Sequence, residues 1–164
     1  MDFIRVTVED DHDLFPLGLT EVLEEEDDID VVGQATGGRE ASELAGTHEP
    51  DVVMMDLGMP GQRGIGATAY IGQKWPDVKV LVLIVSEEPN DLFRALVVGA
   101  PGYVPKTTSP SEIVDALHQV YQDWVVVSPA MAPRFMADST QLSSLLKTPT
   151  PKRPESIFSL IPQP

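Results

Sequence analysis

Short apolar runs rich in β-branched residues alternate with amphipathic segments along the first 120 or so residues of this chain. A strand joins a parallel neighbour only through a crossover, which is most often a helix. The alternation therefore predicts five strands in a doubly wound parallel sheet, with helices on both faces. The predicted strands are 4–8, 29–35, 51–55, 78–85 and 102–104, and the predicted helices are 14–23, 39–45, 65–74, 91–98 and 109–121.

Boundary residues divide the chain into a domain and a tail. Ser109 and Pro110 are a helix N-cap and a first-turn proline, and they fix the start of the last clear helix. We predict a globular domain over 1–123 and an extension over 124–138, with an extended stretch at 125–127 and a short helix at 129–136. Residues 139–164 are rich in proline, which favours an extended or disordered linker.

Composition excludes several classes of function. The formal net charge of −15 makes the chain alone a poor ligand for nucleic acid. The chain has no cysteine, which rules out disulfides and thiolate metal sites and fits a cytoplasmic protein. The longest apolar run, 80–85, is too short to cross a membrane, and the acidic start does not resemble a signal peptide.

Four charged residues follow the predicted strands. Asp10 and Asp11 come after the first strand, Asp56 ends the third, and Lys106 follows the fifth. Because ligands of such sheets bind at the carboxyl ends of the strands, we expect these side chains to share one crevice. Clustered carboxylates require a hard cation, most simply Mg²⁺. Asp56 would then attack phosphorus in line, while Lys106 would hold a phosphoryl oxygen.

The same segments resemble a known family. VEDDHDLFPLGL, PDVVMMDLGMPG, VLVLIVSEEPNDLFRALVVGAPGY and VPK are similar to the receiver domain of bacterial two-component response regulators. The likeness covers about residues 4–136 and is greatest to the NarL/FixJ (LuxR-type) group. It implies a flavodoxin-like, (βα)5 CheY-like fold.

The resemblance also assigns roles. Asp56 matches the phosphoacceptor, Asp10 and Asp11 match the acidic pair that handles Mg²⁺, and the Gly58 backbone carbonyl matches a further metal ligand. Lys106 matches the lysine that contacts the phosphoryl group. Tyr103 matches an aromatic residue whose rotation reports phosphorylation. From the residues alone, Tyr103 is more simply explained as a half-buried side chain on an edge strand.

Several positions depart from the family pattern. Ile84 stands where the family has a Ser or Thr that donates to the phosphoryl group, so one neutral hydrogen bond of about 1 kcal/mol would be lost. Ser86 is more simply a loop residue than a substitute donor, and His12 is a loop residue near the site. Glu9 stands at an apolar position, and we expect it either to point into the cleft or to lie at the rim. Pro105 removes an amide donor beside Lys106.

The resemblance implies partners as well. A sensor histidine kinase would supply the phosphoryl group, and a homodimer could form through the fourth or fifth predicted helix. DNA would be bound only through a helix-turn-helix domain. The last ten residues, ESIFSLIPQP, look like the approach to such a domain, so we expect the chain to lack it.

Three alternatives remain open. A degenerate receiver would act by protein contacts without phosphorylation, which Ile84 and Pro105 favour. A phosphatase of the haloacid dehalogenase type would need an aspartate at 58, where Gly58 stands. A flavin-binding flavodoxin-like protein would need a phosphate-binding loop after the first strand, and the sequence shows none there.

Overall fold

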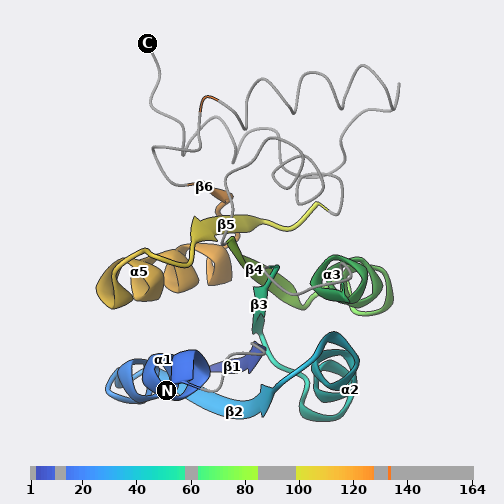
Figure 1. The fold of residues 1–164 in the computed structure, drawn as a ribbon, viewed down its shortest axis with the longest axis horizontal. Helices are drawn as coiled ribbons and strands as arrows, with labels where there is room; N and C mark the ends of the chain where they lie inside the picture. The colour runs from blue at the N-terminus through green and yellow to red at the C-terminus, as the bar shows by residue number, and fades with distance from the viewer. Residues whose placement is uncertain (1–2, 10–13, 58–62, 85–98, 128–132, 134–164) are drawn as a thin grey trace.

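The computed structural model describes residues 3–9, 14–57, 63–84, 99–127 and 133. Six parallel strands form one sheet in the order β2-β1-β3-β4-β5-β6 (Figure 1). The strands are β1 Ile4–Glu9, β2 Ile29–Ala35, β3 Val52–Asp56, β4 Lys79–Ile84, β5 Gly102–Pro105 and β6 Val126–Val127. The described helices are α1 Leu14–Glu24, α2 Gly38–His48, α3 Arg63–Lys74 and α5 Pro110–Tyr121.

The helices cover both faces of the sheet, as the alternating pattern predicts. Figure 1 shows α1 and α5 on one side and α2 and α3 on the other. Each side has its own apolar cluster, because successive side chains of a strand point to opposite faces. Ser109 caps α5 by accepting a hydrogen bond from the Glu112 N–H at 3.4 Å, and Pro110 occupies the first turn, as predicted.

The sheet has six strands and not the five predicted, and the sixth comes from the extended stretch that was predicted at 125–127. Asp123, with a φ of 71°, turns the chain after α5, and the Val126 N–H donates to the Pro101 carbonyl at 2.8 Å. Val125 and Val126 are both buried, and β6 pairs in parallel with β5. The predicted helices at 91–98 and 129–136 lie outside the described residues, apart from Pro133. None of the helices in the described ranges is both long and apolar enough to span a lipid bilayer.

Two buried threonines provide a test of the core. The Thr7 hydroxyl in β1 has no hydrogen-bond partner among the described residues, whereas the Thr68 hydroxyl in α3 donates to the Gly64 carbonyl at 2.7 Å. A buried hydroxyl without a partner costs free energy, so Thr7→Val is expected to raise the free energy of unfolding by about 1 kcal/mol. Thr68→Val is expected to give no gain. Urea unfolding of both variants checks this, and equal gains would contradict the explanation.

Candidate functional site

The carboxyl ends of four neighbouring strands form the edge that the sequence indicates. β1 ends at Glu9, β3 at Asp56, β4 at Ile84 and β5 at Pro105. The registers bring these ends together, since Glu9 lies opposite Met55 and Ile84 lies opposite Pro105. The polar residues at this edge therefore belong to one place in the fold.

Asp56 and Lys106 form an ion pair at this edge. The Lys106 Nζ donates to the Asp56 Oδ2 at 3.0 Å, although 50 residues separate the two in the chain. The Asp56 side chain is 0% exposed and that of Lys106 is 13% exposed. Charge-assisted hydrogen bonds of this kind are stronger than neutral ones, and the low exposure limits screening by salt.

Backbone hydrogen bonds position both partners of this pair. The Lys106 N–H donates to the Ile84 carbonyl at 2.9 Å, which attaches the residue after β5 to the end of β4. The Leu57 N–H donates to the Leu83 carbonyl at 3.0 Å and holds the chain directly after Asp56. The pair thus joins the end of β3 to the residue after β5, and β4, which lies between these two strands, holds both through its backbone carbonyls.

Glu9 does not lie at the rim, which was one of the two expectations for it. Its side chain is 0% exposed, and its Oε2 accepts a hydrogen bond from the backbone N–H of Asp56 at 3.2 Å. Sequence reasoning missed this contact. The available signal was a carboxylate at an otherwise apolar strand position, directly before two aspartates.

α3 also approaches the Asp56 backbone closely. A Cβ placed on Gly64 would lie 2.6 Å from the Asp56 carbonyl oxygen and 2.9 Å from the Leu57 side chain. Any larger residue at 64 would therefore displace the end of β3. Glycine is required here by the close approach.

Ile84 and Tyr103 belong to the apolar cluster on the α2 and α3 side of the sheet. Both are buried, and Tyr103 is only 1% exposed. Because β6 flanks β5, Tyr103 does not lie on an edge strand, so the half-buried alternative was wrong. Burial raises the pKa of the Tyr103 hydroxyl well above its usual value, with a smaller opposing effect from a hydrogen bond with the Ala100 backbone, so the phenol stays neutral.

Other predicted site residues lie outside the described residues, namely Asp10, Asp11, His12, Gly58 and Ser86. Within the ranges that the structure does describe, no group of three histidine, aspartate or glutamate side chains is placed to hold a metal ion. What the described part contributes is the Asp56 carboxylate, a hard oxygen donor of the kind that Mg²⁺ prefers.

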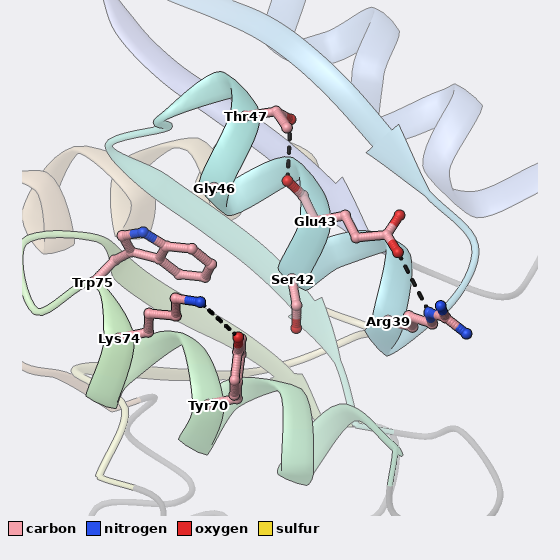
Figure 2. Close-up of a pocket in the computed structure, with 8 residues that line it drawn as sticks. All are labelled: Arg39, Ser42, Glu43, Gly46, Thr47, Tyr70, Lys74 and Trp75. Atoms are coloured by element: carbon pink, nitrogen blue, oxygen red, sulfur yellow. Dashed lines mark hydrogen bonds and ion pairs between the residues drawn. The ribbon is translucent and has the colours of Figure 1, made fainter.

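A separate surface cleft of about 520 Å³ lies between α2 and α3 (Figure 2). Its polar groups bind one another: the Lys74 Nζ donates to the Tyr70 hydroxyl at 3.1 Å, and the Arg39 Nε pairs with the Glu43 Oε1 at 3.3 Å. A Cβ on Gly46 would lie 2.9 Å from the Trp75 ring, so this glycine lets the indole pack against α2. None of the predicted site residues lines this cleft.

Residues 6–118 match the response regulator receiver domain family. The chain belongs to this family. It is 41% identical over 138 residues to the response regulator GacA of Pseudomonas viridiflava, covering 84% of this chain and 64% of that protein. It is 38% identical over 120 residues to the response regulator protein VraR of Staphylococcus saprophyticus, covering 73% of this chain and 57% of VraR.

Solved structures agree with this assignment. The signal receiver domain of NarL from Mycobacterium tuberculosis matches with a TM-score of 0.70 at 34% identity, covering 74% of this chain and 98% of that one. A two-component response regulator of the LuxR family from Aurantimonas matches with a TM-score of 0.76 at 29% identity, covering 85% and 99%. The receiver fold and the kinship with LuxR-type regulators, both expected from the sequence, are thereby confirmed.

Proposed function

We propose that this receiver accepts a phosphoryl group on Asp56 from the phosphohistidine of a sensor kinase. The observation that carries the proposal is the buried Asp56–Lys106 pair at the carboxyl edge of the sheet, with its 3.0 Å contact. A carboxylate beside a fixed ammonium is a nucleophile next to a site for an anionic oxygen. Family membership supplies the reaction class.

Both side chains have a role in the proposed transfer. A carboxylate oxygen of Asp56 attacks phosphorus, the phosphorus–nitrogen bond to the histidine breaks, and its electron pair stays on the imidazole nitrogen. Lys106 exchanges part of its contact with Asp56 for a phosphoryl oxygen, acting as a movable point charge. Hydrolysis of the resulting acyl phosphate by water returns Asp56 to its starting state.

Mg²⁺ is part of this proposal. The ion would be held by Asp10, Asp11, the Asp56 carboxylate and the Gly58 carbonyl. Each of these groups supplies a hard oxygen donor, which is the type of ligand that Mg²⁺ favours. When bound, the ion reduces the repulsion between an acidic site and an anionic phosphoryl group. The Asp56 carboxylate is suited to a cation site, because it already pairs with the ammonium group of Lys106.

The wider role also belongs to the proposal. The chain spans about 64% of the length of GacA, so the activity of a whole regulator is inferred here only by kinship. We place the receiver in the cytoplasm, with a histidine kinase as the phosphodonor. Tyr103 would report phosphorylation, and a surface on α5 or on residues 91–98 would form a homodimer. Transcription would be regulated through a helix-turn-helix domain, which 1–123 does not supply. Residues 124–138 would extend the receiver, and 139–164 would form a linker.

A second candidate function is interaction without phosphorylation. Ile84 favours it, because this buried side chain offers no hydroxyl at the strand end beside Lys106. Pro105 adds to this by removing one amide donor. The Asp56–Lys106 pair opposes it.

Incubation of the chain with acetyl phosphate and Mg²⁺, followed by intact-mass measurement, separates the two functions. The wild-type chain is expected to gain the mass of one phosphoryl group, and Asp56→Asn none, because the amide is not a nucleophile at neutral pH. Omission of Mg²⁺ is expected to reduce the gain strongly. No gain in the wild type would overturn the proposal in favour of interaction alone.

A further inference from the structure

Glu9 is buried at a position where an apolar residue would satisfy the fold. The other face of β1 carries Val6 and Val8, which belong to the core, and Glu9 itself is 0% exposed. Burying a polar side chain costs free energy that a hydrogen bond only offsets. Core packing alone therefore does not explain a glutamate at this position.

The hydrogen bond of Glu9 is directed at the backbone of the residue that we propose as phosphoacceptor. Successive N–H groups of a strand point alternately to its two neighbours. The Leu57 N–H donates toward β4, so the Asp56 N–H points toward β1, where the Glu9 Oε2 accepts it at 3.2 Å. The carboxylate thus extends the link between β1 and β3 by one residue beyond their register, which ends at Glu9 and Met55.

Three contacts with described residues hold Asp56. Glu9 holds its N–H, Lys106 contacts its Oδ2, and the close approach of Gly64 in α3 confines its carbonyl oxygen. With the N–H and the carbonyl fixed, the direction of the Cα–Cβ bond is fixed as well. The carboxylate then has only its own two side-chain torsions left, and Lys106 restricts those.

From these contacts we infer that Glu9 is a positioning residue for Asp56, which orients the phosphoacceptor for in-line attack through the hydrogen bond to its backbone. This inference rests on the proposed function. It concerns Glu9 as a hydrogen-bond acceptor and not as a metal ligand. A nucleophile that is out of position reacts much more slowly. Loss of the Glu9 hydrogen bond is therefore expected to lower the rate of the chemical step and to leave the affinity for the phosphodonor unchanged.

Two substitutions distinguish loss of the hydrogen-bond acceptor from other changes to the Glu9 side chain. Glu9→Gln keeps a carbonyl oxygen at the same distance along the side chain, and Glu9→Met keeps the length and the burial but cannot accept the bond. With acetyl phosphate and saturating Mg²⁺, Glu9→Met is expected to lower the maximal rate of phosphorylation about tenfold, with the half-saturating acetyl phosphate concentration unchanged. Glu9→Gln is expected to restore the rate to within about threefold of wild type.

Two further measurements exclude a merely structural role. The amide proton of Asp56, observed by NMR, is expected to keep its chemical shift in Glu9→Gln and to move upfield in Glu9→Met as the hydrogen bond is lost. Thr7→Val, a buried change on the same face of β1, is expected to leave the rate unchanged. A Glu9→Met rate equal to wild type would overturn the inference, as would a Glu9→Gln rate as low as that of Glu9→Met. Absence of phosphorylation in the wild type would instead overturn the proposed function.

Discussion

Replacing Lys106 with methionine is expected to lower the free energy of unfolding by about 3 kcal/mol and to slow phosphorylation severely. Methionine fills a similar volume, but it leaves the Asp56 carboxylate, which is 0% exposed, without the ammonium at 3.0 Å. Removing one partner of a buried ion pair costs roughly 3–5 kcal/mol, because the remaining charge is left in a medium of low dielectric constant. Urea unfolding of Lys106→Met measures the loss.

A double-mutant cycle isolates the interaction from other effects of the substitution. In the Asp56→Asn background the uncompensated charge is absent, so Lys106→Met is expected to cost less there by about 1–3 kcal/mol. Lys79 and Asp123 provide a matched control, with an Nζ–Oδ1 distance of 2.8 Å but an acid that is 67% exposed. Their coupling is expected to be below about 1 kcal/mol. Equal couplings in the two cycles would show that burial does not strengthen the Asp56–Lys106 pair.

The sequence was sufficient for the parts of the fold that depend on long, regular patterns. β2 begins and ends at the predicted residues, because its run of β-branched and apolar residues is bounded by acidic residues before it and glycines after it. The meeting of Asp56 and Lys106 was also predictable, since both follow strands of one parallel sheet and such strands end at a common edge.

The remaining features depend on tertiary contacts that no local pattern encodes. An extended stretch at 125–127 was predicted, but its pairing with β5 was not, because β6 has only two residues, too few to show a period. The pairing of β6 with β5 also contributes to the burial of Tyr103, which the sequence alone placed on an edge strand. The direction of the Glu9 side chain depends on which backbone N–H remains available at the end of β3, and this is settled only when β1 and β3 are in register.

Ile84→Thr is expected to strengthen the response of Tyr103 to beryllofluoride, which mimics a bound phosphoryl group. If the proposed function is right, a threonine hydroxyl at 84 would donate one hydrogen bond to the anion. In the wild type, the Ile84 side chain belongs to the same apolar cluster as Tyr103 and has no group that can donate. One such bond is worth about 1 kcal/mol, which would shift a two-state equilibrium of Tyr103 about fivefold.

The measurement uses ¹⁹F NMR of protein labelled with fluorotyrosine, whose three signals are assigned with Tyr→Phe variants at 70, 103 and 121. Ile84→Val is the matched control, because valine has the shape of threonine and leaves a similar cavity but carries no hydroxyl. Wild type and Ile84→Val are expected to show a small change in the Tyr103 signal on addition of beryllofluoride and Mg²⁺, and Ile84→Thr a large one. Equal changes in all three would mean that the missing hydroxyl does not limit the coupling. The readout would then depend on how β5 and β6 hold Tyr103 in the core, because the same burial that keeps the phenol neutral also opposes its rotation toward solvent.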